Sequence, residues 1–214
     1  MQHCDKVLVS TTDILDTARE YTVDAEYLPS PVDTTIFYPK RSKQQGEKLR
    51  VLLASSCDWR LKGTEKAINA LSKVKEDVEV SVIHYGKDFY KTMALARSLG
   101  LHVNVLPKTS HANMREYYWN ADVVMDQFEF GVMGMISLEA IACDRPILTD
   151  VSSKYDFYKE FPLKDVKAVG EIVESFQETP SKLWRTEYNY LRQHHEPEKV
   201  VKRTNDICGE LLSD

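Results

Sequence analysis

The feature that most constrains this chain is a regular alternation between short apolar runs and longer stretches of helical periodicity. The apolar runs are rich in Val, Ile and Leu, and they predict strands at residues 6–10, 50–54, 79–84, 102–106, 122–125 and 146–148. The stretches between them predict helices at residues 11–21, 64–74, 88–99, 112–119 and 133–143. Because strict alternation of strand and helix requires parallel strands joined by crossovers, we expect an α/β fold with a Rossmann-like, doubly wound parallel sheet.

Local signals support these helices and extend the helical pattern to the end of the sequence. Between residues 64 and 74, four apolar residues recur at helical spacing and mark one face: Ala67, Ile68, Leu71 and Val74. Gly100 follows the predicted helix at residues 88–99 in the position of a C-cap. After Val151 the pattern predicts a helical C-terminal tail, with helices at residues 164–178, 181–192 and 198–212.

Composition narrows the class of protein. With 214 residues, of which 43% are hydrophobic, the chain can bury a substantial core and needs no disulfide or metal ion to fold. A net charge of −5 argues against a nucleic-acid surface, so a bound anion requires a local pocket. The four cysteines form no C-x-x-C pair, the first ten residues lack the apolar stretch of a signal peptide, and no run reaches membrane-spanning length. We therefore expect free thiols in a soluble, cytoplasmic protein.

Two loops that follow predicted strands carry unusual chemistry. The first, SSCDWRLKG at residues 55–63, places Arg60 and Lys62 just before a predicted helix. Cations do not stabilise a helix N-terminus, which is already positive, so their convergence indicates a bound anion such as a diphosphate. The alternative is that both side chains are solvated surface residues.

The second loop, DQFEFGVMG at residues 126–134, opens the predicted helix at residues 133–143. Gly131 and Gly134 permit close backbone approach and leave amides free at the helix start, as a phosphate or sugar site requires. Glu139 lies within this mostly apolar helix, so its carboxylate needs partners such as ribose hydroxyls. The alternatives are a simple turn for the two glycines and an exposed helix edge for Glu139.

These motifs, taken in order, resemble family 4 of the GT-B glycosyltransferases. The matching segments are LPSPVD at residues 28–33, FYP at 37–39, RLKG at 60–63, ADV at 121–123, SLEAIA at 137–142 and RPI at 145–147. The resemblance runs from about residue 4 to residue 150 and implies a GT-B donor-binding domain. It further implies that residues 1–38 are the end of an N-terminal domain, that residues 39–48 are a linker, and that residues 49–214 form the nucleotide-sugar-binding domain.

The resemblance assigns roles to individual residues. It implies that Arg60 and Lys62 contact the donor diphosphate as catalytic residues, with Gly63 completing their loop. Glu139 matches the second glutamate of the family's E-x7-E motif, which holds the ribose, and Gly134 matches a glycine whose backbone lines the sugar–phosphate pocket. Leu106 and Pro107 fall where the family places a loop that contacts the nucleobase.

One departure from the family concerns the first glutamate of that motif. Counting back from Glu139 leads to Gly131, so Asp126 or Glu129 is left to reach the donor sugar. Retention of configuration is implied by the family alone. No D-x-D motif stands at a strand end, and Arg60 and Lys62 supply positive charge, so we expect no metal and no cofactor.

The function that these residues predict is transfer of a sugar from a nucleoside diphosphate donor, UDP in preference to GDP, to a glycan or lipid-linked acceptor. The alternative is a donor-binding module that is inactive without a separate acceptor-binding domain. The family's first domain is absent, which predicts a fragment, a domain of a longer polypeptide or a minimal form. A second domain or self-association is expected to cover the cleft face.

Four expectations concern packing. The apolar stretch Phe128, Phe130, Val132 and Met133 either forms a contact surface or packs inward under the tail helices. The aromatic run at residues 117–119 is expected to be core and rim. The aromatic residues Tyr155, Phe157, Tyr158 and Phe161 are expected to pack under the tail helices, and the alternative is that they line an acceptor groove. The pair His194–His195 is expected on a solvated helix surface.

Overall fold

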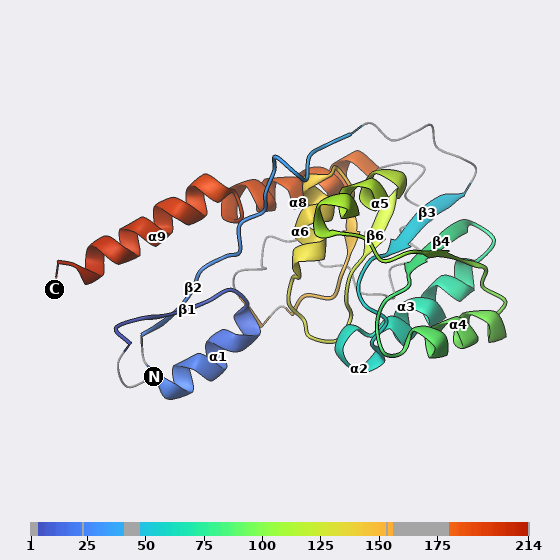
Figure 1. The fold of residues 1–214 in the computed structure, drawn as a ribbon, viewed down its shortest axis with the longest axis horizontal. Helices are drawn as coiled ribbons and strands as arrows, with labels where there is room; N and C mark the ends of the chain where they lie inside the picture. Colours follow the sequence, from blue (N-terminus) through green and yellow to red (C-terminus); the bar gives the residue numbers. More distant parts are fainter. Residues whose placement is uncertain (1–3, 23, 41–47, 153, 156–179, 214) are drawn as a thin grey trace.

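A parallel sheet of five strands forms the main body of the chain. The computed structural model describes residues 4–22, 24–40, 48–152, 154–155 and 180–213. The sheet has the strand order β5-β4-β3-β6-β7 (Figure 1). Its strands are β3 (Leu49–Leu53), β4 (Val78–Ile83), β5 (Val103–Leu106), β6 (Val123–Met125) and β7 (Ile147–Leu148), and every pair is parallel. The predicted doubly wound α/β sheet is thus confirmed.

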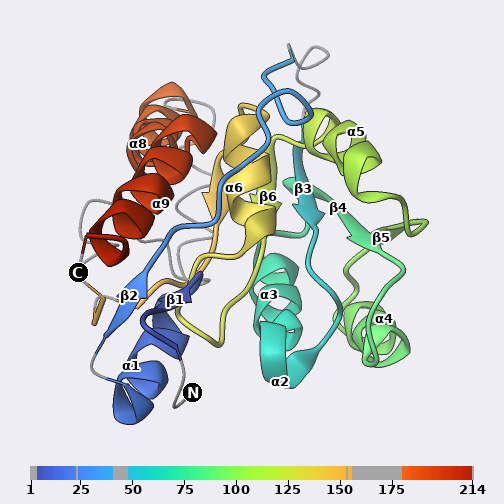
Figure 2. The same ribbon diagram turned by 60° about the vertical axis from the view of Figure 1, so that its left-hand side comes forward.

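Helices cover both faces of this sheet (Figure 2). One side carries α3 (Thr64–Leu71), followed by the 3-10 turn η1 (Ser72–Val74), and α4 (Phe89–Ser98). The other carries α5 (Met114–Asn120), α6 (Met135–Ala142) and α8 (Pro180–His194). Alternate residues of β3 enter different core clusters, because successive side chains of a strand point to opposite faces. Val51 and Leu53 pack on the α3–α4 side, whereas Leu52 packs on the α5–α6–α8 side.

A second, two-stranded parallel sheet precedes the main one. It pairs β1 (Val7–Val9) with β2 (Ala25–Tyr27), and α1 (Thr12–Tyr21) connects the two strands. Val9, Leu15, Ala18 and Ala25 form a small core of their own. The sequence predicted β1 and α1 but missed β2, because a three-residue strand with a central glutamate has no recognisable apolar run.

The segment at residues 28–40 links the two sheets by crossing the helices α5 and α6. Val32 and Phe37 are fully buried in the core cluster that these helices share. The indole Nε1 of Trp119 donates to the carbonyl of Tyr38 at 2.8 Å, and the guanidinium of Arg145 donates to that of Lys40 at 3.0 Å. The expected burial of the aromatic run is confirmed at its centre, since Tyr118 and Trp119 are both buried.

The C-terminal helix α9 (Pro197–Leu211) runs back toward the two-stranded sheet (Figure 1). The Nε of Arg203 donates to Glu26 Oε1 of β2 at 2.9 Å, and Lys6 lies 3.1 Å from the other oxygen of that carboxylate. The predicted tail helices at residues 181–192 and 198–212 are confirmed as α8 and α9. The helix expected at residues 164–178 and the aromatic residues Phe157, Tyr158 and Phe161 lie outside the described residues.

His195 corrects the expectation of a solvated histidine pair. Its side chain is buried, and Nδ1 lies 2.9 Å from the carbonyl oxygen of Ser30. The backbone N–H of Val32 donates to the carbonyl of His195 at 3.0 Å, so the α8–α9 junction is fastened to the linking segment. The sequence showed only adjacent polar residues and gave no signal for this tertiary contact.

The cysteines and the helices of the described residues bear on two further expectations. All four cysteines are free thiols, with Cys57 and Cys143 buried and Cys4 and Cys208 exposed, as predicted. None of the helices described is both long enough and apolar enough to cross a membrane.

Candidate functional site

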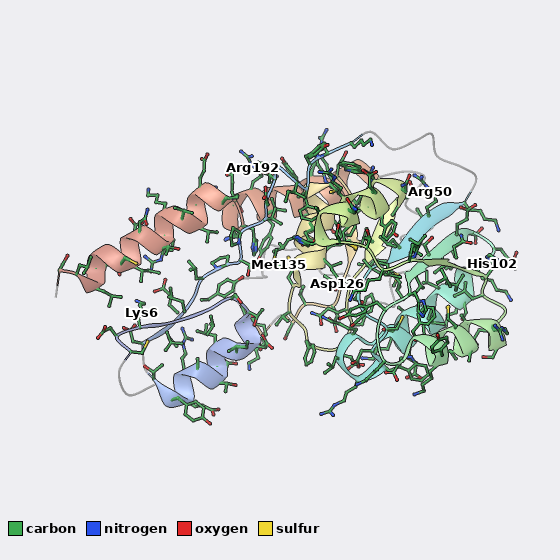
Figure 3. The ribbon with its side chains drawn as sticks, in the orientation of Figure 1. Lys6, Arg50, His102, Asp126, Met135 and Arg192 are labelled. Atoms are coloured by element: carbon green, nitrogen blue, oxygen red, sulfur yellow. The ribbon has the colours of Figure 1, made fainter. Side chains whose placement is uncertain are left out.

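The site lies where the chain reverses its direction across the sheet. From β3 the strands proceed outward through β4 to β5, and β6 then returns to pair with the other side of β3. Open α/β sheets bind ligands at such a switch point, beyond the carboxyl ends of the strands. Both predicted loops follow these ends. In Figure 3, Asp126 of the second loop and Met135, the first residue of α6, lie between Lys6 on one side and Arg50 and His102 on the other.

The two loops pack directly against each other. The backbone N–H of Phe128 donates to the carbonyl of Lys62 at 3.0 Å, and Nζ of Lys66 donates to the carbonyl of Phe128 at 3.0 Å. Gly63 adopts a left-handed conformation, with φ of 63°, and a Cβ there would lie 3.1 Å from the Cβ of Phe128. The conformation and the close approach both favour glycine at this position.

The first loop contains a short helix that the sequence did not predict. Helix α2 (Trp59–Lys62) is one turn long, and the Asp58 side chain caps it by accepting from the N–H of Leu61 at 2.9 Å. Arg60 and Lys62 lie in its last turn, where cations favour a helix. The two cations therefore stabilise the end of α2, contrary to the expectation from the sequence, although both still stand immediately before α3. Arg60 is exposed, and the charge of Lys62 acts on the carboxylate of Asp126.

Asp126 lies beneath the glycine that opens α6. A Cβ on Gly134 would lie 2.7 Å from Oδ2 of Asp126, so a larger residue at that position would strike the carboxylate. The same oxygen accepts from the hydroxyl of Ser137 at 2.8 Å. Burial raises the pKa of Asp126, and the Ser137 hydroxyl and the charge of Lys62 oppose that shift.

Gly131 stands where the family resemblance predicted a carboxylate. Its φ is 64°, and a Cβ there would lie 2.9 Å from the Cβ of Ser152. The backbone N–H of Ser152 also donates to the carbonyl of Gly131 at 2.8 Å. Position 131 is thus closed to a side chain in this conformation. Glu129, two residues earlier, forms an ion pair with Lys66 of α3 at 2.9 Å.

Glu139 is buried in α6 with a partner on each carboxylate oxygen. Nε2 of His111 lies 2.6 Å from Oε1, and the hydroxyl of Tyr118 donates to Oε2 at 2.9 Å. Burial raises the pKa of Tyr118 well above its ordinary value, and the adjacent negative charge of Glu139 adds to the shift. Glu139 is only 3% exposed, which excludes the alternative of an exposed helix edge.

His111 and Tyr118 are site residues that sequence reasoning missed. His111 begins the 3-10 turn η2 (His111–Asn113), and its ring lies 5.1 Å from that of Phe37 in the linking segment. Its side chain is 66% exposed, whereas Tyr118 is fully buried, so the histidine covers Glu139 on its solvent side. The sequence offered one signal for such partners: a glutamate within an apolar helix, whose buried carboxylate requires hydrogen-bond donors from elsewhere in the fold.

The predicted nucleobase loop follows β5 and precedes η2. Leu106 ends β5, and its carbonyl accepts from the N–H of His84 at 2.8 Å. The carbonyl of Pro107 accepts from the hydroxyl of Tyr117 on α5 at 2.9 Å. Residues 106–111 therefore form one continuous path from the sheet to the histidine beside Glu139.

The apolar stretch of the second loop divides between core and surface. Phe128, Val132 and Met133 are buried, as the inward-packing alternative predicted, whereas Phe130 is 46% exposed. Phe128 belongs to the core cluster on the α3–α4 side, which also contains Ile68 and Leu71, and not to the cluster that includes residues of the tail helix α8. Within the described part of the chain, no cluster of three or more His, Cys, Asp or Glu residues is arranged to hold a metal ion.

Comparisons with solved structures agree with this architecture. Sucrose-phosphate synthase of Thermosynechococcus elongatus superposes with a TM-score of 0.76 at 17% identity, over 99% of this chain and 59% of that one. HepE of Anabaena, solved in complex with UDP and glucose, gives a TM-score of 0.74 at 14% identity, over 100% and 64% of the two chains. The C-terminal domain of a group 1 glycosyl transferase from Francisella tularensis gives 0.59 at 18% identity, over 78% and 99%.

These similarities show the fold, which is that of the GT-B glycosyltransferases. The chain spans about 59–64% of the length of the first two structures. The comparison with curated proteins returned no match. The family model described as "Glycosyl transferases group 1" matches residues 36–161, a region that contains both loops, His111 and Glu139. This chain therefore belongs to the group 1 family of glycosyl transferases.

Proposed function

We propose that the chain binds a nucleoside diphosphate sugar, a UDP-sugar in preference to a GDP-sugar, and serves in transfer of its hexosyl group to a glycan or lipid-linked acceptor. The observation that carries this proposal is the packing of the α2–α3 loop against the Gly134 loop at the switch point of the sheet. The complex of the Anabaena protein with UDP and glucose supports a donor of this class.

The proposed donor contacts follow the geometry of the two loops. Arg60 and Lys62 contact the diphosphate, the backbone at Gly63, Gly131 and Gly134 lines its pocket, and Glu139 accepts from ribose hydroxyls. Leu106 and Pro107 border the nucleobase. Because position 131 has no carboxylate, Glu129, which is exposed and two residues earlier, is left to reach the donor sugar.

The hard chemical step is departure of the nucleoside diphosphate. Arg60, Lys62 and the N-terminus of α6 stabilise the negative charge that develops on the leaving group, with about 2–4 kcal/mol from each donor. In this proposal, transfer retains the anomeric configuration and requires no metal or cofactor.

A second candidate is a donor-binding module that transfers sugar only when an acceptor site joins it. The observation that favours this candidate is that the chain matches only 59% and 64% of the length of the two GT-B structures. Under it, another domain or a second copy of the chain covers the face that includes both loops, where Phe130 and Met135 are exposed.

A ligand panel and a transfer assay test both candidates. We expect UDP-sugars to raise the melting temperature of the chain more than GDP- or ADP-sugars at equal concentration. Failure of every nucleotide sugar to do so would overturn the proposal. Light scattering during a transfer assay then separates the candidates, because full turnover by a strict monomer would contradict the donor-binding module.

A further inference from the structure

The carboxylate of Asp126 is buried with one oxygen unsatisfied. The residue is 2% exposed at the carboxyl end of β6, and its Oδ2 accepts from Ser137. Its Oδ1 is buried and has no hydrogen-bond partner among the residues that the structure describes. A charged oxygen without a donor is costly in a protein interior, whereas a proton on that oxygen removes most of the cost.

The surroundings of Asp126 leave its charge balanced by few groups. The positive charge of Lys62 in α2 favours the ionised carboxylate. Three neutral donors at the start of α6 do the same: the Ser137 hydroxyl and the backbone amides of Gly134 and Ser137. Tyr118 of α5 is a titratable neighbour of Asp126. The negative charge of Asp126 contributes to the raised pKa of this tyrosine. Lys62 and the amides at the start of α6 are also the groups that the proposed function assigns to the donor diphosphate.

We propose that Asp126 takes up a proton from solvent when the diphosphate of the donor binds, so that donor binding weakens as the pH rises. This inference rests on the proposed function, since it needs an anion between Lys62 and Gly134. The bound diphosphate brings negative charge beside a buried carboxylate and engages the cation that stabilised it. Both effects favour the neutral carboxyl group, and the proton settles on the Oδ1 that has no other partner.

Proton uptake is measured by calorimetry of UDP-glucose binding in two buffers with different ionisation enthalpies, from pH 5.5 to 8.5. UDP-glucose is the suitable probe because its diphosphate diester does not titrate in this range. We expect uptake to approach one proton per site in part of the range, where affinity falls by up to tenfold per pH unit. Binding without proton uptake at any of these pH values would overturn the inference while leaving the proposed function intact.

Two variants identify the group that takes up the proton. Asp126→Asn keeps the shape of a protonated carboxyl group, so proton uptake is expected to vanish and affinity at high pH to exceed that of the wild type. Ser137→Ala removes the hydroxyl that favours the charged carboxylate, so the uptake is expected at a higher pH than in the wild type. This second variant keeps the test available if Asp126→Asn does not fold.

His111 provides the control, because its imidazole lies beside the buried carboxylate of Glu139 in the same candidate site. His111→Gln is expected to leave the proton uptake unchanged, whatever its effect on affinity. Uptake that is lost in His111→Gln but kept in Asp126→Asn would contradict the assignment to Asp126. If no nucleotide sugar binds at any pH, the proposed function fails and the inference fails with it.

Discussion

Nε2 of His111 lies 2.6 Å from Oε1 of Glu139, so an exposed ring from the loop after β5 covers a buried carboxylate in α6. This contact connects the proposed nucleobase loop with the proposed ribose ligand. Because a carboxylate oxygen has two lone pairs, Glu139 can accept from a ribose hydroxyl while it keeps its protein partners. The pair therefore forms one edge of the proposed donor site in the free protein.

Glu139→Gln is expected to weaken UDP binding about tenfold while leaving the affinity for inorganic pyrophosphate unchanged. The amide offers a single acceptor oxygen, so one charge-assisted hydrogen bond of about 1.5 kcal/mol is lost at the ribose end of the ligand. Calorimetric titration with both ligands measures the difference. Glu116→Gln, the same change at an exposed position of α5, serves as the matched control. Equal losses for UDP and pyrophosphate would assign Glu139 to the phosphate side of the site.

Lys62→Ala and Arg60→Ala are each expected to weaken UDP binding by roughly ten- to hundredfold, with little change in melting temperature. Each removes a charge-assisted contact of about 1.5–3 kcal/mol, and neither residue belongs to a core cluster. Lys73→Ala, on η1 at the opposite end of α3, is the control and should bind UDP as the wild type does. Unchanged affinity in both loop variants would refute the phosphate assignment.

Donor binding and any turnover are expected to survive an excess of EDTA. Arg60 and Lys62 provide the positive charge that a divalent ion otherwise supplies to a diphosphate, so removal of free metal leaves the proposed contacts intact. Titration of UDP before and after chelation is the direct measurement. A strict requirement for Mg²⁺ or Mn²⁺ would contradict the proposed mechanism.

Stability is expected to fall between pH 6.5 and pH 4 because of His195. Burial lowers the pKa of this histidine from 6.5 to about 4, so the fold favours its neutral form. The contribution is fully present above pH 6.5, declines as the pH falls toward 4, and amounts to about 3 kcal/mol over the window. Denaturant unfolding at several pH values measures it. His195→Asn should flatten this part of the profile, whereas His194→Asn, at the adjacent partly exposed residue, should preserve it.

Arg203→Ala is expected to speed amide hydrogen exchange in β1 and β2. The guanidinium holds Glu26 of β2 from α9, and the two-stranded sheet has only a small core to protect its amides. Arg192→Ala is the control, because its ion pair with Glu196 spans the junction of α8 and α9 and involves neither strand. Identical exchange in both variants would show that α9 contributes nothing to the protection of this sheet.

The sequence predicted the main sheet and its principal helices because its strands are short apolar runs separated by stretches of helical periodicity. Val51, Leu52 and Leu53 form an unbroken apolar run, as expected for a strand buried on both sides. The strand β2 escaped prediction because its residues carry no such pattern and its pairing with β1 is a tertiary contact. The left-handed backbone of Asp144, with φ of 63°, was not predicted either.

The candidate site was predicted less completely than the fold. Spacing identified Glu139 and the two loops, because family motifs preserve the order of residues along the chain. His111 and Tyr118 were missed, because their contact with Glu139 depends on how α5 packs against α6. The order of residues also gave no indication that Gly63 separates two helices or that Ser152 presses against Gly131.

That last contact limits how this site can change. A glutamate introduced at position 131 would need a backbone conformation that disfavours side chains, and its Cβ would meet Ser152 at 2.9 Å. A carboxylate introduced at position 131 is therefore expected to require a shift of the loop or a change at Ser152. The two positions are thus coupled, and the effect of a substitution at Gly131 is expected to depend on which residue stands at position 152.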